Sequence, residues 1–221
     1  MSSRMLYRLS GGALIAASLL IIVHSILNNV LFSGGRNTTP QQYMSLPWLV
    51  VGLVSLIGSL LFVSGLPGMY LRQAGRAGVL GLVGFILVFF DLVLQGAFST
   101  LQVTILPLLA QVAPKLLEGE TLPGGMFLLL LVFSLLDVIG AILLGIATIR
   151  AQVFPRWTGV LLIIAGIGAG LLFAFPGAII EIASTIVFSA AFVWCGYALI
   201  AGGRGTVEEA HLAMTAAQTV R

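Results

Sequence analysis

The chain has 221 residues, of which 59% are hydrophobic and only 8% are charged. Soluble domains carry about 25% charged residues, so this chain could not cover a water-exposed surface with polar groups. A net charge of +3 and a mean hydropathy of +1.15 describe a protein solvated by lipid, with no nucleic-acid partner and no room for a separate soluble domain. Its one cysteine, Cys195, excludes an internal disulfide and a CxxC metal or redox pair.

Six apolar stretches are long enough to cross a bilayer, which takes about 20 residues of helix. The spans cover about residues 9–32, 47–71, 77–101, 124–149, 157–175 and 178–201, and a polar tail follows at 202–221. The first stretch exceeds the roughly 7–15 apolar residues of a secretory signal peptide, so we interpret it as a retained span. The sequence therefore predicts an all-α fold, a single polytopic transmembrane six-helix bundle.

Proline and glycine mark the connections between these spans. The triplet Phe175-Pro176-Gly177 predicts a tight turn between the last two spans. Residues 105–120 are apolar but contain Pro107 and Pro114, which favours a short helix lying at the outer surface of the membrane. That helix would either cap a cavity or shield an apolar connector among lipid headgroups.

The basic residues predict how the bundle is oriented. Eight of the ten lie on one side, namely Arg4, Arg8, Arg72, Arg76, Arg150, Arg156, Arg204 and Arg221, and two lie on the other, Arg36 and Lys115. Short loops rich in Lys and Arg stay in the cytoplasm. Both termini are therefore expected to be cytoplasmic, which agrees with an even number of spans.

Four ionisable side chains lie inside the apolar spans without a Lys or Arg to balance them: His24, Asp91, Asp137 and Glu181. A charge at the centre of a membrane helix costs ~2.5–3.5 kcal/mol on insertion scales, and such residues usually face a bundle interior or a wet cavity. At ~1.5 Å per residue, the first three lie about 18–21 Å from the cytoplasmic ends of their spans. Glu181 lies nearer the outer surface.

Further polar residues continue the same helix faces. Asn28 lies four residues after His24 and Gln95 four residues after Asp91, so each pair shares one face. We therefore predict a ligand- or ion-binding set made of Asp91, Asp137, His24, Gln95, Asn28 and Glu181. Two competing interpretations stay open, since isolated polar residues often join helices by hydrogen bonds and Glu181 lies at a depth where water could solvate it.

Three acids facing one histidine suit a particular chemistry. In a low dielectric they would take up protons, hold a cation or pair with His24 as imidazolium, unless a funnel hydrates them. The chain contains no HExxH, GxSxG or P-loop motif. With a single histidine inside the spans, we predict no metal and no cofactor.

Span 157–175 carries Gly166-x-x-x-Gly170, a spacing that lets two helices approach closely. This small-residue face predicts packing inside the bundle more than contact with a second copy. Association with an oligomer or a membrane partner subunit stays open.

The stretch Leu135–Gly166, LLDVIGAILLGIATIRAQVFPRWTGVLLIIAG, joins a glycine-containing span to another apolar span through an Arg and a short loop ending in Pro-Arg-Trp. In this it resembles a group of uncharacterised bacterial integral membrane proteins of unknown function. The resemblance implies a bacterial inner-membrane setting and supplies no functional residues.

Three functions are compatible with these features. The first is a small membrane protein that binds or moves a proton, a cation or a small polar ligand entering from the outer face, with Asp91 and Asp137 as the binding groups. The second is an intramembrane enzyme acting on a lipid or isoprenoid substrate by general acid–base catalysis, which leaves open whether the chain is an enzyme. The third is a structural or accessory subunit, in which the acids only join helices.

Overall fold

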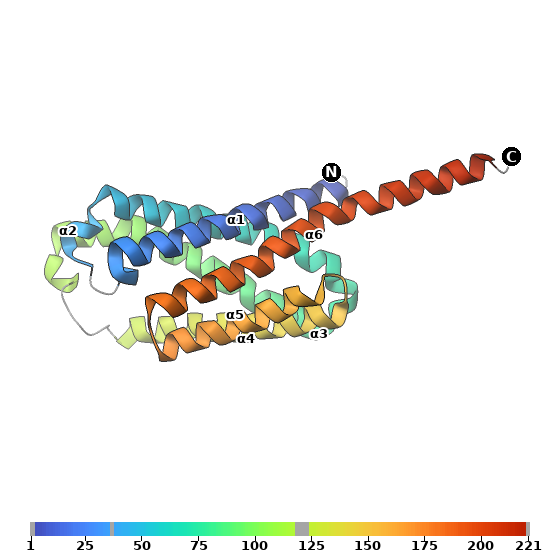
Figure 1. Ribbon diagram of the computed structural model, residues 1–221. Coiled ribbons are helices and arrows are strands. Elements are labelled where there is room, and N and C mark those ends of the chain that lie inside the picture. The colour runs from blue at the N-terminus through green and yellow to red at the C-terminus, as the bar shows by residue number, and fades with distance from the viewer. Residues whose placement is uncertain (1–2, 36–37, 118–123, 220–221) are drawn as a thin grey trace.

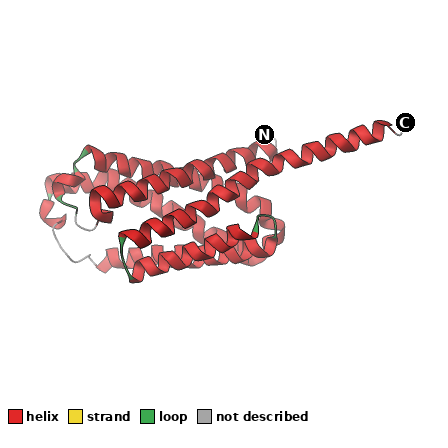
Figure 2. Ribbon diagram, viewed as in Figure 1, coloured by secondary structure: helices red, strands yellow, loops and turns green. Residues whose placement is uncertain are grey.

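The computed structural model describes residues 3–35, 38–117 and 124–219, and in these ranges it contains helices and short connections without any strand (Figure 2). The long helices are α1 (Ser3–Phe32), α3 (Leu46–Val112), α4 (Gly124–Ala151), α5 (Arg156–Ala174) and α6 (Ala178–Thr219). The short elements are α2 (Pro40–Tyr43) and the 3-10 turns η1 (Ser33–Gly35) and η2 (Pro114–Leu117). The predicted all-α fold is confirmed. A helix satisfies every backbone group within its own segment, which lipid requires.

Helix α3 is a hairpin, because the chain reverses at Gly78 (Figure 1). Gly78 has φ 60° and ψ −164°, a conformation that a residue with a Cβ rarely adopts. On either side the chain runs antiparallel: Trp48 Nε1 donates to the Gln102 backbone oxygen at 3.0 Å, and the Ser55 and Ser99 hydroxyls share a 2.8 Å hydrogen bond. We call residues 46–77 the first arm and residues 79–112 the second arm.

Five helices are long and apolar enough to cross a membrane, and α3 is counted among them as one helix. Each arm of α3 is by itself longer than the ~20 residues that a span needs. Large apolar side chains cover the outward faces at helical spacing, as Leu19, Val23 and Val30 do on α1. The opposite face of α1 buries Leu14 and Ile21. Apolar residues on both faces are typical of helices that lie between protein and lipid. The chain is a multi-pass membrane protein.

The six helical segments form a closed ring in the order α1, first arm, second arm, α4, α5 and α6, which returns to α1. The second arm thus lies across the ring from α6, and α1 lies across from α4. Glycines permit the closest approaches: a Cβ on Gly11 would lie 2.5 Å from the Gly196 oxygen, where α1 meets α6. The face predicted on α5 also packs inside the bundle, since a Cβ on Gly166 would lie 3.0 Å from the Val138 oxygen of α4.

One end of the ring is rich in arginine. Arg8 lies in the second turn of α1, Arg72 and Arg76 precede the reversal at Gly78, and Arg150 and Arg156 flank the connection from α4 to α5. These segments and the N-terminus lie together, and α2, η2 and the turn before α6 lie at the opposite end (Figure 1). Helix α6 continues beyond the bundle at the arginine-rich end (Figure 1), so the expected boundary at residue 201 falls inside a continuous helix.

The prediction of a separate surface helix at residues 105–120 is wrong in its first part. Pro107 lies inside α3, which continues to Val112 before η2 begins at Pro114. A proline removes one backbone donor and crowds the preceding turn, yet membrane helices tolerate it when neighbouring groups compensate. The second arm is therefore longer than the span expected at residues 77–101.

The half of the ring nearest the arginine-rich end is filled with apolar side chains. Its members come from five of the helical segments and are at most 1% exposed: Leu14, Leu66, Leu144, Leu162, Phe192, Cys195 and Leu199. We call this region the packed half. The opposite half of the ring contains the cavity described next.

Candidate functional site

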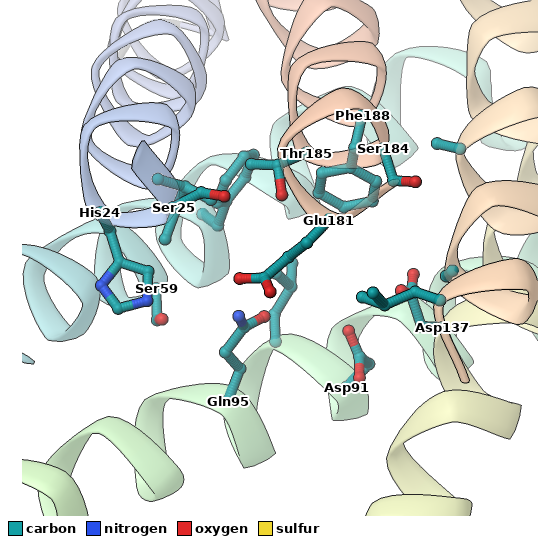
Figure 3. A pocket seen from close by; sticks show the side chains of 16 residues that line it. His24, Ser25, Ser59, Asp91, Gln95, Asp137, Glu181, Ser184, Thr185 and Phe188 are labelled. Carbon is teal, nitrogen blue, oxygen red and sulfur yellow. The ribbon is translucent and has the colours of Figure 1, made fainter. Parts of the chain in front are cut away.

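A cavity of about 270 Å³ lies inside the ring, and all six helical segments contribute to its lining (Figure 3). The ring closes around it because each segment packs against its two neighbours. Five of the six residues predicted from the sequence line the cavity: Asp91, Asp137, His24, Gln95 and Glu181. Side chains from the second arm, α4, α1 and α6 therefore converge on one shared space.

Asp91 and Asp137 lie on adjacent segments, with carboxyl groups close enough to interact electrostatically (Figure 3). Their proximity follows from how the second arm and α4 pack. A Cβ on Gly140 would lie 2.9 Å from the Val88 backbone nitrogen, so the two helix backbones nearly touch there. Gly140 and Val88 each lie three residues from one of the acids, which puts both acids one turn from this contact and on the cavity side.

Glu181 belongs to the first turn of α6 and points into the cavity toward the Gln95 side chain of the second arm (Figure 3). The turn at Phe175-Pro176-Gly177 places it there: α5 ends at Ala174, α6 begins at Ala178, and the Glu181 N–H donates to the Gly177 oxygen at 3.0 Å. This turn confirms the sequence prediction. Because Glu181 lines the cavity, solvation at the membrane surface is not its whole environment.

His24 is held by the first arm of α3. Its Nδ1 lies 3.1 Å from the Val51 backbone oxygen, which can only accept, so Nδ1 carries the hydrogen. In the neutral imidazole the other nitrogen, Nε2, is then an acceptor. It lies on the side of the imidazole that faces the cavity (Figure 3). The histidine is thus fixed in orientation and presents a proton acceptor to the cavity.

Four hydroxyl side chains also line the cavity, Ser184 and Thr185 of α6 and two serines that were missed by the sequence analysis, Ser25 and Ser59. Ser59 of the first arm donates its hydroxyl to the Ser55 backbone oxygen at 2.9 Å, as serines in membrane helices commonly do. Ser25 is 4% exposed, lines the cavity, and its Oγ has no hydrogen-bond partner. The signal for Ser25 was its position beside His24, but adjacent residues on a helix point about 100° apart, so sequence alone did not favour it.

Aromatic side chains close the cavity toward the packed half. The Phe62 ring of the first arm lies 5.8 Å from the Phe188 ring and 5.1 Å from the Phe192 ring of α6, and the last two lie 4.7 Å apart. These centroid distances are those of favourable edge-to-face and tilted pairs. Phe62 and Phe188 also line the cavity. We call the three rings the aromatic cluster.

Asn28 is not among the lining residues, so this member of the predicted set is not brought to the site. It lies one turn beyond His24, and its buried Oδ1 has no hydrogen-bond partner. Two polar residues one turn apart on the second arm, Gln95 and Ser99, also differ in their surroundings. Gln95 lines the cavity, whereas Ser99 is bonded to Ser55 and joins the two arms, as the helix-joining interpretation expects.

The carboxyl groups do not form a cage for a divalent metal. Within residues 3–35, 38–117 and 124–219, no three His, Cys, Asp or Glu side chains come together as metal ligands. His24, Asp91 and Asp137 therefore do not come together as a set of metal ligands. The cavity instead offers oxygen acceptors from several helices around an open space.

Comparison of the chain with protein-family models, with curated proteins and with solved structures finds no match in any of the three. The function must therefore be inferred from the cavity and from the chemistry of the side chains that line it.

Proposed function

We propose that this protein binds a proton or a small cation in the ring cavity and exchanges it with the outer side of a bacterial inner membrane. One observation carries the proposal: three acidic side chains from three helical segments converge on one cavity whose described lining contains no Lys or Arg. The inner-membrane setting follows the resemblance noted in the sequence.

Electrostatics favours a positively charged occupant. An ionised carboxylate that leaves water without a partner costs several kcal/mol or more, so a buried acid either keeps its proton or acquires a counter-charge. Asp91 and Asp137 lie close together, so ionising both would add repulsion to that cost. A proton or cation shared between them removes both penalties. Nε2 of His24 offers a further proton acceptor to the same cavity.

The ends of the molecule favour access from one side. By the positive-inside rule the arginine-rich end faces the cytoplasm, together with both termini. The packed half and the aromatic cluster then lie between the cavity and the cytoplasm, so a ligand would enter from the outer side. Movement across the membrane would require the aromatic cluster to separate, an alternating-access step in which the rings act as the inner gate.

Infrared difference spectroscopy of the full-length protein in lipid nanodiscs tests the proposal, because it observes carboxyl protonation directly. We expect the wild-type carboxyl band to change when pH is stepped and again when Na⁺ or methylammonium is added. Asp91→Asn and Asp137→Asn should remove most of that change and leave the helical circular dichroism spectrum intact. Asparagine keeps the shape of aspartate and cannot ionise.

Thr100→Val is the matched control, because Thr100 lies on the same arm of α3 as Asp91 but is exposed on the outside of the bundle. This variant should keep the wild-type difference spectrum. If the wild-type band responds neither to pH nor to either cation, the acids only join helices and the accessory-subunit interpretation gains support.

A further inference from the structure

The walls of the cavity differ chemically. Asp91 and Gln95 of the second arm and Asp137 of α4 form an acidic wall. Across the ring, α6 lines the cavity with Glu181, Ser184 and Thr185 and, on the far side from Asp91, with Phe188 (Figure 3). Phe62 of the first arm packs against Phe188. An occupant that reaches from the acidic wall to the two phenylalanine rings needs a positive charge at one end and an apolar surface at the other.

The size of the cavity argues against a bare monovalent ion as its only occupant. A volume of about 270 Å³ equals the share of about nine water molecules at ~30 Å³ each. Small-molecule sites begin near ~300 Å³ and are mostly apolar with a few placed polar groups. The described lining is more polar than that but still has an apolar part, because Ile21, Leu92, Ala165, Ala169 and Leu172 join the two phenylalanines beside the polar residues.

The polar groups are arranged for an ammonium rather than for a metal. An alkylammonium has up to three N–H donors that separate acceptors can satisfy, whereas a desolvated metal ion needs a tight oxygen cage. Ser25 supplies a second, independent sign of a ligand: its Oγ is buried, has no hydrogen-bond partner and is directed into the cavity (Figure 3). A buried hydroxyl without a partner loses free energy that a ligand donor or acceptor would restore.

We propose that the cavity binds a primary organic ammonium with an apolar or aromatic substituent. Its ammonium group lies between Asp91 and Asp137, and its substituent packs on Phe188 and Phe62. This inference rests on the proposed cation-binding function and names the chemical class of the cation.

Isothermal titration calorimetry on the full-length protein in detergent tests the ligand class with four probes. Methylammonium, n-butylammonium and benzylammonium share the charged group and differ in apolar size, and benzyl alcohol supplies the ring without the charge. Each buried CH₂ is worth ~0.8 kcal/mol, so we expect benzylammonium to bind at least about tenfold more tightly than methylammonium, with n-butylammonium between them. Benzyl alcohol should bind at least about tenfold more weakly than benzylammonium.

Two variants test which side chains bind the ammonium group and which bind the apolar substituent. Asp91→Asn should abolish benzylammonium binding. Phe188→Leu keeps an apolar side chain and removes the aromatic ring, so it should weaken benzylammonium about fivefold and leave methylammonium within about twofold. The comparison of probes on the wild-type protein decides the proposal even where a variant folds poorly.

The outcomes separate this inference from the proposed function. Equal or tighter binding of methylammonium or Na⁺ than of benzylammonium overturns the ligand class and leaves cation binding in place. Benzyl alcohol binding as tightly as benzylammonium also overturns it, because the acids would then contribute nothing. If the carboxyl band also fails to respond to pH and to every cation, the proposed function fails as well.

Discussion

The packed half and the cavity half are built from the same six helical segments, but side chains fill the centre of the first and leave a cavity in the second. In the packed half, side chains such as Leu14, Leu66 and Phe192 meet at the ring axis and leave no exposed surface. In the cavity half, Asp91, Asp137 and their polar neighbours surround about 270 Å³. The difference lies in which side chains reach the axis, since aliphatic and aromatic groups interdigitate and carboxyl groups do not.

This contrast separates stability from binding within one bundle. Lipid tails are as apolar as leucine, so helix association in a membrane depends on close packing and on hydrogen bonds more than on burial from water. The packed half and the glycine contacts supply that packing, and they leave the cavity half free to keep a void and buried acids that cost stability. Substitutions in the two regions should therefore change the free energy of unfolding by different amounts or in opposite directions.

The largest effect is expected from Phe192→Ala in the packed half. Phe192 is fully buried against Phe62 and Phe188. Removing roughly 100 Å³ at ~24 cal/mol per Å³ of cavity gives a loss of about 2.4 kcal/mol in the free energy of unfolding. Ile186→Ala, on the exposed face of the same helix, is the matched control and should cost much less. Equal losses measured by detergent unfolding would erase the distinction between the packed interior and the lipid-facing surface.

A smaller effect is expected from Gly11→Ala at the contact of α1 with α6. The added methyl would lie 2.5 Å from the Gly196 oxygen, so the helices must separate at a cost of about 1–2 kcal/mol. Its neighbour Gly12 has no atom within 4 Å of a Cβ position, so Gly12→Ala should be neutral or slightly stabilising. Thermal unfolding of the two variants, which differ by one position, measures the contact. If Gly11→Ala unfolded at the same temperature as the wild type, the close approach of the two backbones would not be what holds α1 against α6.

The smallest effect compares two buried serines. Ser55→Ala removes the 2.8 Å hydrogen bond to Ser99 that joins the arms of α3, and should lower the free energy of unfolding by about 0.6–1.7 kcal/mol. Ser25→Ala removes a hydroxyl without a partner, so it should cost nothing in the ligand-free protein. Chemical unfolding in detergent measures both values. A loss at Ser25 equal to that at Ser55 would mean that its hydroxyl already stabilises the fold.

The helices were readable from the sequence because lipid leaves an apolar chain few alternatives. The reversal at Gly78 and the turn at residues 175–177 fell between predicted spans, where glycine and proline signal an interruption. Pro107 was misjudged because its effect depends on whether neighbouring helices compensate for the missing backbone donor, which no local pattern reveals.

The site was predictable in part. Asp91, Asp137 and His24 stood out because an unbalanced ionisable group in a span is costly wherever it points. Ser25 and Asn28 show the limit: one lines the cavity and the other does not, although both lie within a turn of His24. A helix face is about 100° wide, and only the positions of its neighbours decide which edge of that face meets a cavity and which meets another helix.

By itself the sequence determined that this chain is helical, lies in lipid and carries acids inside its spans without a Lys or Arg there, because each of these follows from the transfer energy of single residues and short runs. Only the tertiary structure decided that the helices close into a ring, that the acids share one cavity, and that Phe62 and Phe188 line it as well. Those features depend on which faces pack together, and the packing is set by contacts between residues far apart along the chain.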